Sequence, residues 1–202
     1  NSVTDNGQLF LIGYSEGGYA TMAAHRALQS AGSSTLASLV ATAPGAGPDD
    51  IGVTLDELLR RVREANPLLG AALSPGVLRD LTPVQRALVR ELLLKELLPD
   101  DADVSFDASV LDSYLADDRA TIERLGNVHD WAPAVPVRLF HGRDDQTVPY
   151  VVSTTTLQAM RARGAADVTL TDCTTVPSGH LECVPEYLSI ALADFARRAR
   201  DL

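Results

Sequence analysis

A glycine-flanked serine that directly follows a short apolar run limits this chain's fold more than any other feature. The run is Leu9–Ile12, and the sequence Gly-Tyr-Ser-Glu-Gly at residues 13–17 comes next. A helix-like segment follows, so the pattern predicts a strand, a sharp turn and a helix, which is the context of a nucleophile elbow. Because the serine backbone is strained in such a turn, we expect Gly13 and Gly17 to let strand and helix pass without Cβ clashes.

The elbow gives two residues an expected chemical role. The Ser15 hydroxyl would stand above the carboxyl end of the strand, and the backbone N–H of Glu16, at the helix start, would point to where an oxyanion forms. The alternative interpretation is a glycine-rich turn with an incidental serine.

Composition favours one folded domain and argues against several kinds of partner. With 202 residues, of which 46% are hydrophobic, the chain can bury a sizeable core. A net charge of −10 and the lack of a basic stripe argue against nucleic acid. No apolar run approaches the length of a membrane span. We expect no metal and no cofactor, because no Cys/His cluster has ligand spacing and no second glycine-rich cradle appears.

Short apolar strands and helices alternate at both ends of the chain. Strands are expected at residues 9–12, 35–43, 137–141 and 167–173, and helices from the elbow to Gly32 and over residues 150–163 and 185–200. This alternation predicts an α/β fold with a parallel sheet, in which the first strand is covered on both faces. The residues expected to face the sheet are Ala20, Ala23, Ala24, Ala27 and Leu28 in the first helix, and Leu188, Ala191, Leu192 and Phe195 in the last.

Residues 49–130 look helical throughout. Capping boxes at Thr54–Glu57 and Thr82–Gln85 predict two helix starts, the second with Pro83 at the first helical position. The helix from Thr82 to about Leu98 is apolar nearly all round, so it should be buried or bind something apolar. A third helix is expected over residues 109–125.

A crossover between two strands needs far fewer residues than this helical stretch contains. We therefore expect three parts: an elbow-bearing core segment over residues 1–48, a helical cap inserted at 49–130, and a second core segment at 131–202. The alternative is a plain helical subdomain that does not contact the site.

Two later loops could complete a catalytic site with Ser15. A serine hydroxyl needs a base to take its proton, and the base needs an orienting carboxylate. In an elbow-type enzyme both follow the serine in chain order. The loop at residues 141–149 carries Asp144 and Asp145, and the loop at residues 178–180 carries His180. Both follow strands, so both are expected at the carboxyl edge of the sheet, where active sites of such sheets lie.

The other histidines are weaker candidates. His25 is expected to be a surface residue or to have its hydrogen bonds satisfied. His141 is expected to bond to its neighbouring loop, and His129 is assigned no role.

These motifs resemble those of the α/β-hydrolase family, above all the bacterial relatives of secreted lipases and esterases. The matching stretches are residues 13–20, 43–48, 130–133, 141–149 and 179–180. The likeness covers about residues 9–48 and 127–200, and the helical middle matches only loosely. It implies a partial α/β-hydrolase fold, a parallel sheet with flanking helices and an inserted helical cap.

The resemblance also implies a function. It makes Ser15 the nucleophile, His180 the general base and acid, and Asp145 the orienting carboxylate, with Asp144 as the alternative acid. The implied activity is that of a serine carboxylic-ester hydrolase, which forms an acyl-enzyme with a small-molecule or lipid ester. The alternatives are a peptidase of the same fold and a non-catalytic fragment that needs a partner chain to complete its sheet.

One departure from the family is plain. The family's sheet has several strands before the elbow strand, and a loop among them supplies a second oxyanion donor, but none of these is present here. We therefore expect the strand at Leu9–Ile12 to pair with missing strands of a longer chain or with a second copy, and the second donor to arrive by that route.

Cys173 and Cys183 flank His180, which suggests a disulfide that pins its loop. Closing so short a loop is worth roughly 3 kcal/mol in the chain-entropy picture. A disulfide would place the protein in an oxidising compartment, secreted or periplasmic. The alternative is two reduced cysteines.

Overall fold

The structure is a computed structural model that describes residues 6–76, 79–98 and 106–200. It divides into two compact units. One comprises Asn1–Asp49 with Val128–Leu202, and the other comprises Asp50–Asn127. The first unit contains the sheet, and the second is helical.

Among residues 6–49 and 128–200 of the first unit, four parallel strands form a sheet, as the sequence predicts. They lie in the order β1 (Leu9–Tyr14), β2 (Leu39–Gly45), β3 (Val137–His141) and β4 (Val168–Asp172). Because the strands are parallel and adjacent, the segments that follow them emerge at one edge. Within the described part of the chain, β1 pairs with β2 alone.

The second strand begins later than predicted. Residues Ser34–Ser38 form a short 3₁₀ helix, η1, and β2 starts at Leu39. The Ser33 side chain accepts a hydrogen bond from the backbone N–H of Thr35 and so caps this helix. This local cap outweighs the strand preference of the residues that follow it.

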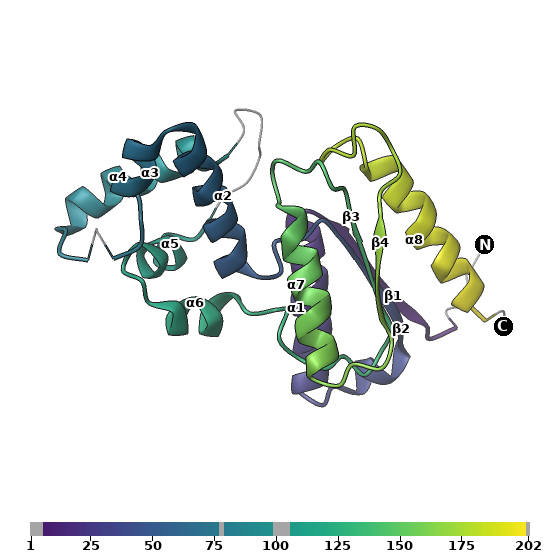
Figure 1. Ribbon diagram of the computed structural model, residues 1–202. Helices are drawn as coiled ribbons and strands as arrows, with labels where there is room; N and C mark the ends of the chain where they lie inside the picture. The colour runs from purple at the N-terminus through teal and green to yellow at the C-terminus, as the bar shows by residue number, and fades with distance from the viewer. Residues whose placement is uncertain (1–5, 77–78, 99–105, 201–202) are drawn as a thin grey trace, which may run out of the picture. The chain divides into compact units, whose positions relative to one another are not determined.

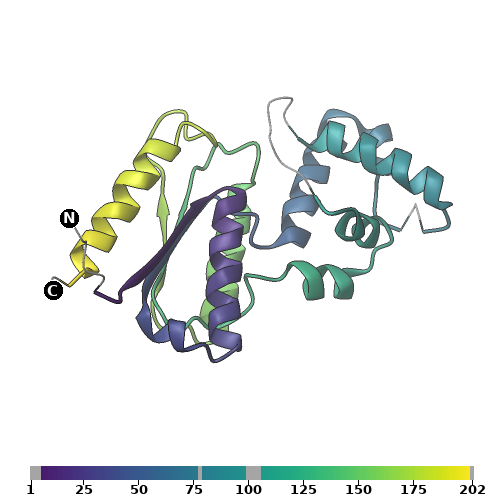
Figure 2. The ribbon, with the colours of Figure 1, turned by 180° about the vertical axis from the view of Figure 1, so that it is seen from behind.

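Helices cover both faces of the sheet (Figures 1 and 2). On one face lie α1 (Glu16–Ser30) and α7 (Tyr150–Ala162), and on the other lies α8 (Val184–Arg198). Alternate strand residues face the two layers. The core under α1 and α7 includes Met22, Val137, Leu139, Met160 and Val168, and the core under α8 includes Ala41, Ala43, Phe140, Tyr187, Ala191 and Phe195.

The helix faces predicted from apolar spacing are partly wrong. In α1, Ala20, Ala24 and Ala27 are exposed, and the buried residues are Gly18, Thr21, Met22 and His25. In α8, Leu188 and Leu192 are exposed, and Tyr187 is buried with Ala191 and Phe195. At Gly18, α1 comes so close to β2 that this side of the helix must face the sheet. A Cβ on Gly18 would lie 2.6 Å from the Gly45 carbonyl oxygen.

The glycines of the elbow have unequal roles. A Cβ on Gly13 would lie 2.1 Å from the Gly17 carbonyl oxygen, so the expectation for Gly13 is correct. The expectation for Gly17 is wrong, because a Cβ there meets no atom within 4 Å. Gly18, not Gly17, is the second glycine that close packing requires.

The described residues of the second unit form five helices. They are α2 (Ile51–Ala65), α3 (Pro67–Ala72), α4 (Pro83–Leu97), α5 (Ala108–Leu115) and α6 (Arg119–Gly126). Their buried core is mostly leucine, with one tyrosine: Leu55, Leu58, Leu59, Val62, Leu73, Leu93, Leu97, Leu111, Tyr114, Leu115 and Ile122. None of the helices in the described ranges is long and apolar enough to cross a membrane.

Predicted helix starts in this unit fare differently. The capping box at Thr82 and Gln85 is confirmed, with Pro83 in the first turn. The box predicted at Thr54 is wrong, because α2 begins at Ile51 with Asp50 as its cap. The Asp50 side chain accepts from the Val53 N–H at 3.0 Å and so caps the helix. Thr54 therefore lies inside α2 and not at its start.

Two other expectations for this unit need correction. The single helix predicted over residues 109–125 is broken into α5 and α6 at Asp117, whose φ of 60° is incompatible with a continuous helix. The apolar α4 buries Leu93 and Leu97 but leaves Val84 and Leu88 exposed.

We predict opposite effects for alanine at the two glycines that flank Ser15. Gly13→Ala should lower the free energy of unfolding by about 3 kcal/mol or more, because its Cβ collides with backbone. Gly17→Ala should raise it by up to about 1 kcal/mol, because the site is open and α1 gains a better helix former. Urea unfolding of both variants measures this difference, and equal destabilisation would contradict the packing described for the elbow.

Candidate active site

Ser15 occupies a strained turn between β1 and α1. Its φ of 59° and ψ of −124° lie outside the regions that non-glycine residues commonly adopt. Such a conformation costs on the order of 1–3 kcal/mol and persists when its surroundings hold it. Here the Ser15 N–H donates to the Gly45 carbonyl at 2.8 Å, and the Ser15 carbonyl accepts from the Gly18 N–H at 2.9 Å. The backbone therefore has the geometry expected of an elbow.

Three predicted site residues from separate segments form one hydrogen-bonded chain. His180 Nε2 lies 2.9 Å from Ser15 Oγ, and His180 Nδ1 lies 2.6 Å from Asp145 Oδ2. The Asp145 side chain is fully buried, and that of His180 is 11% exposed. With a proton on Nδ1 donated to the carboxylate, Nε2 is free to accept the serine proton.

The buried Asp145 carboxylate is held from several sides. Its Oδ1 accepts from the backbone N–H groups of Thr147 and Val148, each at 2.8 Å. Its Oδ2 also lies 3.2 Å from His141 Nε2. His141 thus bonds within its own loop, as expected, and its Nδ1 lies 2.7 Å from Ser153 Oγ.

These contacts keep Asp145 ionised. Burial raises its pKa, but the hydrogen bonds from His141 and His180 outweigh that effect and bring the pKa down to about 2. Because this folded-state pKa is below the ordinary value of about 3.9, the carboxylate stabilises the fold above that value. The contribution is lost as the pH falls toward 2.

Asp144, the alternative acid, has a different partner. Its carboxylate accepts from the Ser178 N–H and hydroxyl, both at 2.9 Å, and these bonds lower the pKa of Asp144. Ser178 precedes His180 by two residues, so this contact ties the acid loop to the histidine loop. The loops also touch at Gly142, where a Cβ would lie 2.0 Å from the Ser178 carbonyl oxygen. We call this contact between Asp144 and Ser178 the latch. It was not predicted from the sequence, although both residues lie in the two loops that the sequence analysis selected.

The predicted disulfide closes the segment that carries His180. Cys173 follows β4, Cys183 precedes α8, and their Cα atoms lie 5.9 Å apart. A second tether was not predicted. The Glu186 carboxylate accepts from the backbone N–H groups of Thr174 and Thr175 at 3.0 and 3.1 Å, and from their hydroxyls. The start of the histidine loop is therefore fixed twice to the first turn of α8.

The remaining predicted positions are also clear. Glu16 is the first residue of α1, so its N–H belongs to the initial helix amides that have no acceptor within the helix. His25 is buried, with Nδ1 3.0 Å from Thr42 Oγ1, and burial lowers its pKa to about 4. His129 Nδ1 lies 3.3 Å from the Asp49 carbonyl oxygen.

No known protein-family model matches this sequence, and no curated protein does. Solved structures do resemble it. The rice cell wall degrading esterase LipA from Xanthomonas oryzae aligns with a TM-score of 0.61 and 20% identity, over 96% of this chain and 60% of LipA. A candidate hydrolase from Legionella pneumophila aligns with a TM-score of 0.66 and 20% identity, over 97% of this chain and 57% of that protein.

A third similar structure is Candida antarctica lipase A, with a TM-score of 0.55 and 18% identity, over 96% of this chain and 50% of the lipase. This chain thus spans about 60% of the length of LipA and half that of the lipase. At such identities the likeness concerns the fold. The chain has a partial α/β-hydrolase fold of the type found in lipases and esterases.

Proposed function

We propose that this chain carries the nucleophile, base and acid of a serine carboxylic-ester hydrolase. The observation that carries the proposal is the hydrogen-bonded chain from Ser15 through His180 to the ionised Asp145, which begins at a strained elbow. A serine whose hydroxyl meets an imidazole that is oriented by a buried carboxylate is equipped for acyl transfer. The esterase and lipase folds of the similar structures support the same reaction class.

The geometry suggests a two-step reaction. His180 Nε2 takes the Ser15 proton as Oγ attacks the ester carbonyl, and the N–H of Glu16 stabilises the resulting oxyanion. His180 then gives the proton to the leaving alcohol, which leaves Ser15 acylated. Water, deprotonated by the same imidazole, attacks the acyl carbonyl; the bond to Ser15 Oγ breaks, the carboxylic acid leaves, and His180 returns the proton to Ser15. Asp145 holds the imidazole in the required tautomer and stabilises its protonated form.

The helical unit is the proposed cap, and we assign it the selection of the substrate. In the chain it follows β2, whose carboxyl end lies at the same edge of the sheet as the Ser15 turn. Its helix α4 presents Val84 and Leu88 to solvent. An apolar helix face of this kind suits an ester with an acyl chain or an aromatic group, which loses contact with water when it binds.

We propose that a strand from outside the described residues pairs with β1 and completes the sheet. The outer edge of β1 carries no strand among the described residues, and Ile12 is 39% exposed. Strands of a longer parent chain, or of a second copy, would pair with this edge and bring the second oxyanion donor.

A secreted or periplasmic location is proposed on the basis of the disulfide. Cysteines stay reduced in the cytosol of most organisms, whereas Cys173 and Cys183 are joined here.

Replacement of the nucleophile should abolish ester hydrolysis without unfolding the protein. Ser15→Ala removes the attacking oxygen, and a fluorophosphonate probe should label the wild type at Ser15 alone. Peptide mass spectrometry locates the label. Labelling of another serine, or none in a preparation that hydrolyses esters, would refute the assignment of Ser15.

The two neighbouring aspartates should differ in their effect on turnover. Asp145→Asn should lower kcat by roughly 10⁴-fold, because an amide no longer favours the required imidazole tautomer. Asp144→Asn should lower it much less, because it only weakens the latch to Ser178. Steady-state kinetics of this matched pair decides the acid, and the reverse order would transfer that role to Asp144.

Amide exchange should reveal the missing partner of β1. Strand amides alternate in direction, and the Ser15 N–H points to β2, so those of Phe10, Ile12 and Tyr14 point to the open edge. These amides should be protected only when the edge is paired, while that of Leu11 should be protected in either state. Light scattering gives the oligomeric state in parallel. A monomer that exchanges them freely yet hydrolyses esters at ordinary enzymatic rates would refute the need for a partner.

A further inference from the structure

Tyr14, the residue before the strained Ser15, contacts His180 in two ways. Its hydroxyl donates to the His180 carbonyl oxygen at 2.7 Å. Its ring packs against the imidazole, with centroids 5.3 Å apart and planes inclined by 50°. One side chain of the elbow thus touches both the main chain and the ring of the histidine that faces Ser15.

The Tyr14 ring also packs against the ring of Tyr187 in α8. The two ring centroids lie 5.1 Å apart, and both rings lie next to Gly45. A Cβ on Gly45 would lie 2.6 Å from the Tyr14 ring and 2.7 Å from the Tyr187 ring, so only a glycine leaves room for the pair.

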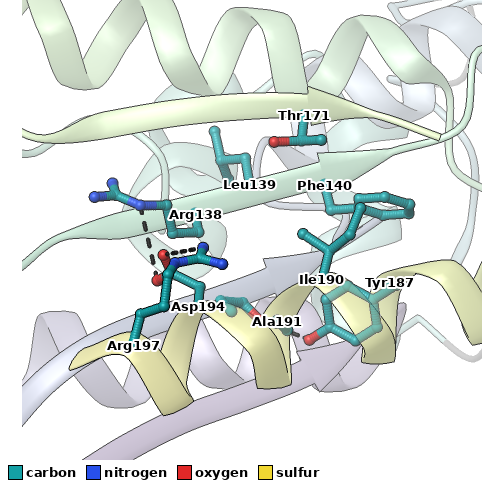
Figure 3. Close-up of a pocket in the computed structure, with 10 residues that line it drawn as sticks. Arg138, Leu139, Phe140, Thr171, Tyr187, Ile190, Ala191, Asp194 and Arg197 are labelled. Carbon is teal, nitrogen blue, oxygen red and sulfur yellow. Dashed lines mark hydrogen bonds and ion pairs between the residues drawn. The ribbon is translucent and has the colours of Figure 1, made fainter. Parts of the chain in front are cut away.

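Tyr187 also anchors the strand that leads into the elbow. Its buried hydroxyl accepts from the Gly13 N–H at 2.9 Å and donates toward the carbonyl oxygens of Ala43, at 2.6 Å, and Gly13, at 2.8 Å. Figure 3 shows its ring rising from α8 beside Phe140 and Ile190, where it lines a cavity of about 140 Å³. Truncation of this ring would enlarge the cavity, whereas phenylalanine keeps its shape.

The other tethers of the histidine loop act at a distance from His180. The disulfide and Glu186 fix the loop at Cys173–Thr175 and at Cys183, and Asp144 fixes it at Ser178. Tyr14 binds the main chain of His180 itself, whereas Asp145 and Ser15 contact its ring nitrogens. Burial, with a further contribution from the Asp145 charge, raises the pKa of Tyr14 above its usual range, so the hydroxyl keeps the proton that it donates.

We propose that Tyr14 is a positioning residue that holds the His180 imidazole at hydrogen-bonding distance from Ser15, with Tyr187 as its support. Rotation of the histidine backbone would move Nε2 away from the serine hydroxyl, and misplacement of a reacting group by about 1 Å can cost 10²-fold in rate. We call Tyr14 and Tyr187 together the tyrosine brace. The inference rests on the proposed function for its kinetic consequence, but the positioning of His180 can be measured without it.

Tyr14→Phe keeps the ring and removes the hydrogen bond to the His180 carbonyl. In the full chain, we expect kcat for a small ester and the rate of fluorophosphonate labelling at Ser15 to fall together by roughly 10- to 100-fold, with KM unchanged. The NMR signal of the His180 Nδ1 proton, which is donated to Asp145, should broaden and exchange faster with water. Tyr187→Phe should lower kcat and the labelling rate and broaden the His180 proton signal in the same way. If Tyr14→Phe does not fold, this second variant tests the brace.

The matched control is Tyr114→Phe in the helical unit. Tyr114 is buried, as Tyr187 is, and its hydroxyl donates to Asp56 at 3.0 Å, so its loss should lower stability without a change in the His180 proton. If Tyr14→Phe and Tyr187→Phe behave like this control, the brace is refuted. If the Tyr14 variant loses the protected His180 proton while the wild type hydrolyses no ester, the brace stands and the proposed function fails.

Discussion

The close packing of β1, α1 and β2 around Ser15 is the constraint on which the rest of the site depends. The serine backbone is held at a positive φ by its hydrogen bond to Gly45, at a cost of about 1–3 kcal/mol. Gly13 and Gly18 permit the approach, because a Cβ on either would overlap backbone atoms. Packing of the helices on the sheet must therefore offset the free-energy cost of this strained backbone. The turn places the serine hydroxyl at the carboxyl edge of the sheet, next to the loops that follow β3 and β4.

Those loops come from the far end of the chain, and several tethers reduce the freedom that they would otherwise have. Asp145 is fixed by two backbone amides, and Asp144 binds the loop of His180 through Ser178. The disulfide and Glu186 hold the start of that loop to α8. A site assembled from separate loops needs such support, because each ordered residue costs conformational entropy.

The same sheet has an open side. β1 carries the elbow and yet pairs with one strand in the described chain, whereas the similar esterase and lipase structures are considerably longer than this chain. Both residues of the proposed tyrosine brace contact this edge strand, since Tyr14 ends β1 and Tyr187 of α8 binds Gly13 within it. A strand that pairs with β1 would therefore act on the element that leads into the Ser15 turn and contacts His180 through Tyr14.

Local patterns were enough to predict the parallel sheet, the strand at Val137–His141, the capping box at Thr82 and the loops that carry Asp145 and His180. Each of these depends on neighbouring residues or on chain order. The rotation of α1 and α8 was predicted wrongly, because apolar spacing defines a stripe but contacts with distant backbone, as at Gly18, decide which stripe is buried. The cap at Asp50 and the latch between Asp144 and Ser178 depend on which of several similar polar groups comes within bonding distance. The contact between Tyr14 and His180 joins residues 166 positions apart. No local pattern encodes such a contact, since only the folded sheet and the closed loops bring the two residues together.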